Sequence, residues 1–147
     1  KNNNINEIVH LNKYCKNRQF KLYLANNFKL AWKLNLDGAY IPAFNKSLKH
    51  KLYPIKRDFL IIGSSHNVTE IRYKIKQGCK KIFLAPIFPI SKKKNYLGLF
   101  NFRNLVSKTK IEIIALGGIN EFNIKKLKIS GCSGHASISH IKKTAQK

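Results

Sequence analysis

Residues whose types and spacing could carry out chemistry gather in three short segments of this sequence. The first is Ile61-Ile-Gly-Ser-Ser-His66, which places the hydroxyl of Ser64 and the imidazole of His66 directly after an apolar run. The imidazole could shuttle a proton near neutral pH. The alternative is a structural histidine that only bonds its own loop.

The second segment is Ile113-Ile-Ala-Leu-Gly-Gly-Ile-Asn120, an apolar run that opens onto a glycine pair just before helical spacing. Gly117 and Gly118 allow the backbone to approach a ligand closely, and a following helix N-terminus would offer N–H groups to an anion. The Ser-Ile-Ser stretch 137–139, after the next apolar run, could complete a phosphate cup. A tight turn that needs glycine for its geometry alone is the alternative.

The third segment is Ala85-Pro-Ile-Phe-Pro-Ile-Ser-Lys-Lys-Lys94, the longest connection in the chain. Long loops at the mouth of a barrel are often lids, and its three lysines could clamp a diphosphate. A lysine run on a solvated surface is the alternative.

Apolar runs that predict strands alternate with segments of helical spacing, and these elements must position the three segments. Helical spacing is found before the first strand, over 5–14, and again over 28–34, 71–79, 99–106 and 124–128. Asn67 or Thr69 predicts the start of the third helix, and Gly78 predicts its end. Strands are expected at Phe20–Ala25, Ala39–Ile41, Phe59–Ile62, Lys81–Leu84, Ile111–Leu116 and Gly134–Ile138.

Strands that alternate with helices predict a parallel sheet in a single domain over residues 1–147. Two architectures fit this order, an open doubly wound sheet and most of a (β/α)8 barrel. The open sheet should carry a glycine-rich turn after its first strand, where Asn26-Asn27-Phe28 stands instead. Barrels gather phosphate sites after their last two strands, where Gly117 and Gly118 lie, so the barrel is favoured.

The net charge of +23 comes from 29 Lys and Arg against 6 Asp and Glu. Only four of the basic residues are arginine, and the lysines spread over every segment, which argues against dedicated nucleic-acid binding. Lysines interrupt every apolar run before it reaches the roughly 18–20 residues of a membrane span. The start resembles no secretory signal, and the chain has no methionine, so we expect a cytoplasmic protein and a truncated chain.

Cysteine and histidine spacing predicts no metal centre. Cys15, Cys79 and Cys132 form no Cys-x-x-Cys pair and are expected to be reduced thiols. No pair of histidines has the spacing of a zinc site.

Together, the motifs resemble the thiamine phosphate synthase/TenI family. In order, they are a Ser-x-His turn at 64–66, Pro-x-Phe-Pro at 86–89 with lysines after it, Gly-Leu at 98–99, Ala-x-Gly-Gly-Ile at 115–119 and Ile-Ser at 138–139. The resemblance covers about residues 21–141. It implies a (β/α)8 TIM barrel of which the first two strands are missing before Lys1.

The resemblance also implies roles for particular residues. In the synthase, a thiazole phosphate attacks hydroxymethylpyrimidine diphosphate and expels diphosphate with the help of Mg²⁺. Ser64 and Lys93, or its neighbour Lys92, match diphosphate contacts, and in TenI proteins the histidine that matches His66 moves the proton in thiazole tautomerisation. His66, Ser64 and Lys93 are therefore the expected catalytic residues. The expected substrate and phosphate contacts are Asn26, Ser64, Lys92, Lys93, Gly117, Gly118, Ile138 and Ser139.

The sequence departs from the synthase pattern where Mg²⁺ is held. Asn27 and Asn45 stand where the synthase has aspartates, and amides bind this cation far less well than carboxylates. Ile90 replaces an expected threonine, and Pro42 is closer to TenI proteins. No metal is therefore expected. Three hypotheses remain: a synthase, a metal-independent TenI-like tautomerase, and a non-catalytic protein that binds a phosphorylated ligand or nucleic acid.

Overall fold

Helices and strands alternate along almost the whole chain, as the sequence predicts. The computed structural model describes residues 4–90 and 95–137. The elements in chain order are α1 (Ile5–Asn17), β1 (Tyr23–Ala25), α2 (Phe28–Lys33), β2 (Gly38–Ile41), the 3-10 helix η1 (Lys49–Leu52), β3 (Leu60–Ser65), α3 (Val68–Lys76), β4 (Lys81–Leu84), α4 (Gly98–Ser107), β5 (Glu112–Leu116), the 3-10 helix η2 (Ile124–Ile129) and β6 (Gly134–Ala136).

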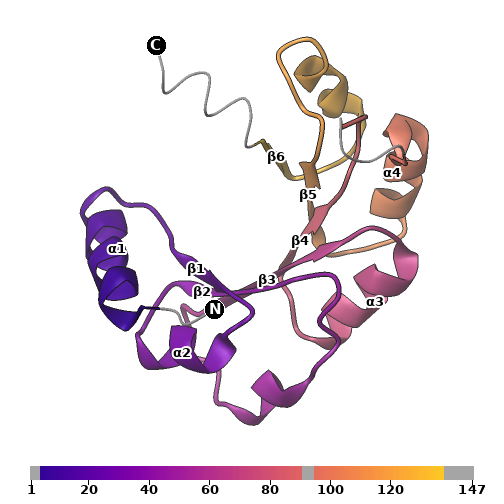
Figure 1. The fold of residues 1–147 in the computed structure, drawn as a ribbon. Coiled ribbons are helices and arrows are strands. Elements are labelled where there is room, and N and C mark those ends of the chain that lie inside the picture. The colour runs from indigo at the N-terminus through magenta and orange to yellow at the C-terminus, as the bar shows by residue number, and fades with distance from the viewer. Residues whose placement is uncertain (1–3, 91–94, 138–147) are drawn as a thin grey trace.

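The six strands form one parallel sheet in sequence order, β1-β2-β3-β4-β5-β6. Figure 1 shows this sheet as an arc with α2, α3 and α4 along its outer side. An α/β fold with consecutive parallel strands is therefore confirmed. Within residues 4–90 and 95–137, β1 and β6 do not pair with each other, so the arc is an open part of a barrel rather than a closed one.

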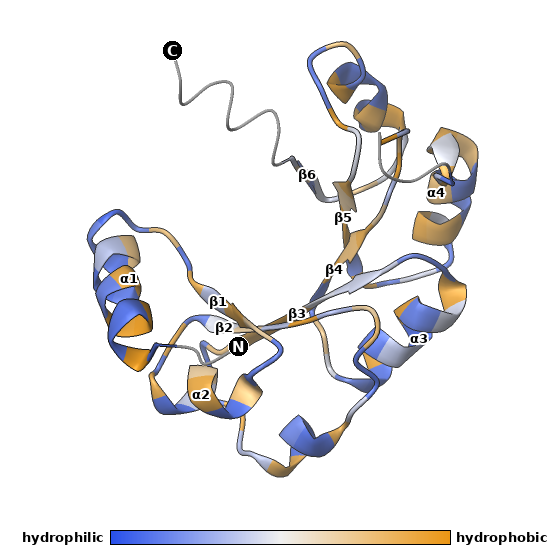
Figure 2. Ribbon diagram, in the orientation of Figure 1, coloured by the Kyte–Doolittle hydropathy of each residue, from blue (hydrophilic) through white to orange (hydrophobic). Residues whose placement is uncertain are grey.

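The core lies between the outer face of the sheet and the helices. Every second strand residue points outward into this layer, where Ile82, Leu84 and Ala115 are fully buried. Ala31 of α2 and Phe102 of α4 complete the packing. Figure 2 shows apolar residues along the strands and on the inward sides of the helices.

The inner face of the arc carries larger, half-buried side chains. Tyr40 of β2 meets Phe83 of β4 edge to face, with ring centroids 6.3 Å apart. Tyr23 of β1 and Ile114 of β5 are also half-buried. This is the face that lines the interior of a closed barrel.

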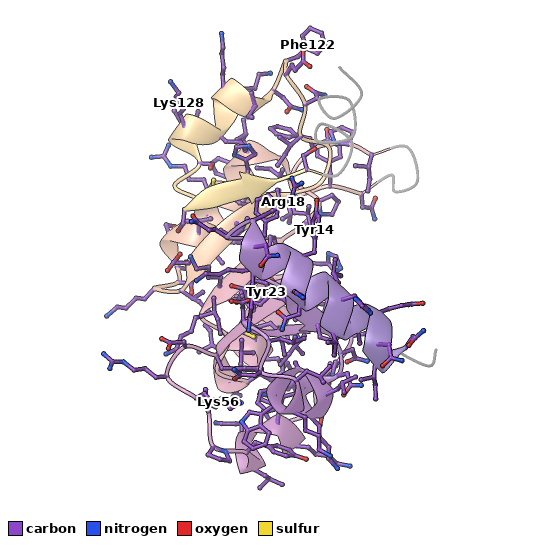
Figure 3. The ribbon with its side chains drawn as sticks, turned by 90° about the vertical axis from the view of Figure 1, so that its left-hand side faces the viewer. Tyr14, Arg18, Tyr23, Lys56, Phe122 and Lys128 are labelled. Carbon is purple, nitrogen blue, oxygen red and sulfur yellow. The ribbon has the colours of Figure 1, made fainter. Side chains whose placement is uncertain are left out.

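α1 flanks the sheet beside β1 (Figure 1). It buries Cys15 and packs Ile8 against the core, while Val9 stays about half exposed. Figure 3 shows Tyr14 and Arg18 near its end, where the Arg18 guanidinium lies 4.9 Å from the centre of the Tyr14 ring. Lys56, Phe122 and Lys128, also labelled there, project from other parts of the surface.

Local hydrogen bonds explain where the helices begin and end. The side chain of Asn27 caps α2 by accepting from Leu30 N, and that of Asn67 caps α3 by accepting from Glu70 N. Gly78 ends α3 with φ +77°, as expected for a residue without a Cβ atom.

The structure corrects several predictions of local structure. The strand expected from Phe20 begins only at Tyr23, because the N–H of Phe20 still donates to the Cys15 carbonyl at the end of α1. β3 runs on to Ser65, so Ser64 is a strand residue rather than a loop residue. The helix expected over 124–128 is a 3-10 helix, not an α-helix.

The crossover from β2 to β3 is unusual for a parallel sheet. Such crossovers are usually α-helical, but residues 42–59 contain only η1. The three cysteines are free thiols, as expected. Among the described residues, no helix is both long and apolar enough to cross a membrane.

Candidate functional site

The carboxyl ends of all six strands meet at one edge of the sheet, because the strands are parallel and consecutive. We call the residues that follow these ends the carboxyl edge. It brings together Asn26 after β1, Asn45 after β2, His66 after β3, Pro86 after β4 and Gly117 after β5. Segments far apart in the sequence therefore share one surface.

Ser64 lies at the carboxyl end of β3 and is buried, with 7% of its surface exposed. Its Oγ accepts a hydrogen bond from Ala43 N over 3.0 Å. A hydroxyl has one hydrogen to donate, and within the described residues that of Ser64 has no acceptor. The neighbouring Ser65 is fully buried on the opposite face, and its Oγ has no partner there.

His66 is fixed by two hydrogen bonds. Its backbone N–H donates to Glu70 Oε2 over 2.7 Å, and its ring Nδ1 lies 2.6 Å from the carbonyl oxygen of Ala85. A carbonyl only accepts, so Nδ1 carries the hydrogen and Nε2 of the neutral ring is left as a proton acceptor. A cavity of about 270 Å³ adjoins the ring, lined by His66, Ala85, Pro86, Asn95, Tyr96 and Leu97. The backbone of His66 bonds its own segment, whereas its ring bonds the segment after β4, and the ring bond leaves Nε2 as the proton acceptor.

Asn26 and Asn45 meet between the ends of β1 and β2. Asn45 Nδ2 donates to Asn26 Oδ1 over 2.6 Å. Asn26 has φ +56°, a left-handed conformation that asparagine tolerates better than most residues. The pair borders a cavity of about 250 Å³, whose lining also includes Tyr40, Lys49 and His50.

Asn27 and Asn45, the positions that the resemblance assigns to Mg²⁺, do not fit that cation. Asn27 Oδ1 accepts from Leu30 N as the cap of α2, and Asn45 Oδ1 accepts from Ser47 N over 2.8 Å. Both oxygens are therefore engaged, and neither is a carboxylate. No group of three or more His, Cys, Asp and Glu side chains suited to a metal occurs in 4–90 or 95–137.

Gly117 and Gly118 are required by a close backbone contact. Both have positive φ, +96° and +69°. A Cβ atom on Gly117 would lie 2.7 Å from Cβ of Pro86, and one on Gly118 would lie 2.6 Å from the carbonyl oxygen of Pro89. The turn therefore needs glycine so that the loop after β4 can pack against it. This is the structural role that the sequence analysis gave as the alternative to phosphate binding.

The helix expected directly after the glycine pair is not there. η2 begins only at Ile124, and the intervening turn is closed by asparagine side chains. Asn123 Oδ1 accepts from Asn120 N, Asn120 Oδ1 accepts from Phe122 N, and Asn123 Nδ2 donates to the Gly118 carbonyl. The N–H groups of Asn120, Phe122 and Asn123 are therefore taken up within the turn, and a contact between the glycine pair and an anion stays a prediction.

Four predicted site residues, Lys92, Lys93, Ile138 and Ser139, lie outside the described residues. Ser137 is the last residue that the structure describes. Its Oγ donates to the carbonyl oxygen of Ile119 over 3.1 Å, which brings the segment after β6 against the segment after β5.

The sequence analysis did not identify Lys74 of α3 or Gln77, which caps the C-terminus of that helix. Both are fully buried, and Lys74 Nζ donates to the carbonyl of Pro42 over 2.7 Å and to that of Asn45 over 2.8 Å. Burial lowers the pKa of the Lys74 ammonium group. In a lysine-rich chain, no signal separates this lysine from its exposed neighbours.

Comparison with known proteins places the chain in a family. The family model described as thiamine monophosphate synthase matches residues 1–141. This chain belongs to the thiamine monophosphate synthase family. The resemblance read from the motifs is thereby confirmed.

Relatives of known name agree. The chain is 31% identical over 137 residues to a thiamine-phosphate synthase of Prochlorococcus marinus subsp. pastoris, covering 92% of this chain and 39% of that protein. It is 26% identical to a thiamine-phosphate synthase of Methanococcus vannielii, covering 81% of this chain and 58% of that one. The chain therefore spans roughly half the length of these relatives.

Solved structures share the fold. A thiamine phosphate pyrophosphorylase from Pyrococcus furiosus superposes with a TM-score of 0.76 at 22% identity, over 95% of this chain and 69% of that one. A structure described as native KDPGal gives 0.69 at 14% identity, over the same shares of the two chains.

Proposed function

We propose that this chain acts in thiamine biosynthesis by binding a phosphorylated thiazole, either thiazole phosphate or thiamine phosphate, at the carboxyl edge. One observation carries the proposal. In a member of the thiamine monophosphate synthase family, Ser64, the Asn26–Asn45 pair and His66 stand at one edge of the sheet, and the hydroxyl hydrogen of Ser64 has no acceptor among the described residues. The Ser64 hydroxyl and the side-chain amides of the asparagine pair donate hydrogen bonds, as phosphate oxygens require, whereas the neutral His66 ring offers Nε2 only as an acceptor.

The binding step does not depend on Mg²⁺ in this proposal. The amide oxygens of Asn27 and Asn45 already accept hydrogen bonds from backbone N–H groups. In this proposal the negative charge of the phosphate is therefore balanced by the basic side chains of the protein instead of by a metal ion. Joining the thiazole to hydroxymethylpyrimidine diphosphate, with release of diphosphate, is the transferase reaction to assay first. Turnover that rises with added Mg²⁺ would contradict the metal-independent form of the proposal.

Calorimetry with thiazole phosphate and thiamine phosphate tests the binding. Ser64→Ala removes the free donor, and we expect it to weaken binding about tenfold. Ser65→Ala is a matched control, because that neighbouring hydroxyl is buried on the other face without a partner in the described structure. Equal affinities for wild type and Ser64→Ala would contradict the assignment. Salt-sensitive RNA binding by both variants, without thiazole binding, would favour a nucleic-acid module instead.

Thiazole tautomerisation is a second candidate, favoured by the hydrogen bond from His66 Nδ1 to Ala85 that leaves Nε2 as a base. Removal of a general base typically costs ~10²-fold or more in turnover, so His66→Ala should abolish most of this activity without any metal. Ser64→Ala should only weaken it. His135→Ala, at an exposed position on β6, is the control.

A further inference from the structure

A lysine ammonium group is buried beneath the loop that follows β2. Lys74 is fully buried, and its Nζ donates to the carbonyls of Pro42 and Asn45 and, over 2.9 Å, to Gln77 Oε1. These three neutral oxygens match the three hydrogens of an ammonium group. Within the described part of the chain, the one ion pair joins two other residues, Lys81 and Glu112. A buried charge is costly unless its donors are satisfied, and here each is.

The oxygens that Lys74 holds lie at two points of the same loop. Pro42 and Asn45 are three residues apart, so one ammonium group fixes both of them relative to α3. Gln77 adds two bonds from its Nε2, to the carbonyl of Asn45 over 2.9 Å and to that of Ser47 over 2.8 Å. Side chains of α3 therefore set the position of residues 42–47, which have no helix of their own.

The held loop makes two contacts with the candidate site. The N–H of Ala43 donates to Ser64 Oγ and so leaves the hydroxyl hydrogen of that serine to point elsewhere. The side chain of Asn45 donates to Asn26 Oδ1. A shift of this loop would loosen Ser64, Asn45 and Asn26 together.

The sheet makes room for the lysine. A Cβ atom on Gly63 would lie 2.8 Å from Cδ of Lys74 and 3.0 Å from Sγ of Cys79. The aliphatic stem of Lys74 thus passes over a glycine of β3 on its way to the loop. The absence of a side chain at Gly63 therefore leaves the space that the Lys74 side chain occupies.

We propose that Lys74 is the positioning residue of the carboxyl edge: through residues 42–47 it holds Ser64 and the Asn26–Asn45 pair in the geometry that binds the phosphorylated ligand. The ligand part of this inference rests on the proposed function. The loop part rests on the hydrogen bonds alone.

The test uses the full chain and replaces Lys74 by Met, which keeps the length of the side chain but removes its donors. Amide hydrogen exchange at Ala43 reports the position of the loop without any ligand, and calorimetry with thiamine phosphate reports binding. We expect exchange at Ala43 to become at least about tenfold faster and binding about tenfold weaker. Lys76→Met is the matched control, because Lys76 is exposed on the same helix and the change in net charge is identical.

Combination with Asn45→Ala tests whether Lys74 acts through the loop. If it does, Lys74→Met should lose less affinity in the Asn45→Ala background than in the wild type, since Asn45→Ala has already removed one of the two contacts that the loop makes with the site. A full additional loss would overturn the inference, as would unchanged exchange at Ala43 in folded Lys74→Met. Lys74→Gln keeps one neutral donor on a shorter side chain and serves as a second variant if Lys74→Met does not fold.

The two proposals fail in different ways. In one outcome, Lys74→Met exchanges faster at Ala43, but the wild type binds neither thiazole phosphate nor thiamine phosphate. This outcome supports the positioning of the loop by Lys74 and contradicts the proposed function. Tight binding that Lys74→Met leaves unchanged supports the proposed function and contradicts the role of Lys74.

Discussion

The carboxyl edge has two halves that are held in place by different kinds of contact. Over β1 to β3, the loop 42–47 is fixed by the side chains of Lys74 and Gln77. Over β4 to β6, the loop after β4 is fixed by backbone bonds, from Ile87 N to the Leu116 carbonyl and from Phe88 N to the Gly117 carbonyl.

The difference has physical consequences. The first half depends on a buried ammonium group beside a buried thiol, so its stability responds to pH and to the loss of one side chain. The second half depends on the absence of Cβ atoms at Gly117 and Gly118, so even the methyl group of an alanine at either position should destabilise it. Side-chain networks and close backbone contacts can therefore shape the same edge and be broken by different substitutions.

Gly118→Ala should have the largest effect on stability. The new Cβ would meet the backbone of Phe88 and Pro89 at 2.6–2.8 Å, and φ is +69°. We expect the free energy of unfolding to fall by about 3 kcal/mol or more, measured by urea denaturation. Gly78→Ala is the matched control, since φ is +77° but nothing lies within 4 Å, and about 1–2 kcal/mol is expected there. Equal losses at the two glycines would show that backbone contact does not hold the second half.

Raising the pH should weaken the first half through Cys79. Burial raises the pKa of this thiol from 9.0 to about 11. A raised pKa in the folded state means that the contribution to stability is complete below pH 9 and is lost as the pH rises towards 11. The loss should reach at most about 3 kcal/mol relative to Cys79→Ala, measured by urea denaturation between pH 8 and pH 11. Parallel pH curves for wild type and Cys79→Ala would rule out this sensitivity.

Glu112→Gln should have the smallest effect. Glu112 Oε2 lies 2.8 Å from Lys81 Nζ, joining β5 to β4, but both side chains are about half exposed. Exposed ion pairs contribute about 0.2–1 kcal/mol, and we expect a loss in that range that shrinks in 1 M salt. A loss as large as that of Gly118→Ala would mean that charge, rather than backbone packing, secures the β4–β5 end of the sheet.

The motifs of the second half could be read from the sequence, whereas the network of the first half could not. A glycine pair after an apolar run and a Pro-x-Phe-Pro loop are local patterns with few structural meanings. Lys74 follows Pro42 by 32 residues, and nothing near it in the sequence predicts that they meet. Ser64 was found by its place before His66, but its contact with Ala43 and its difference from Ser65 needed the structure.

The sequence by itself determined the alternation of helices and strands, the parallel pairing and the cap of α3, because periodicity and capping act over a few residues. Only the tertiary structure decided which lysine is buried, which serine faces the carboxyl edge and why Gly117 and Gly118 cannot carry a side chain. Those outcomes depend on segments that meet across the sheet, and burial and steric contact have no local signature in a chain rich in lysine and serine.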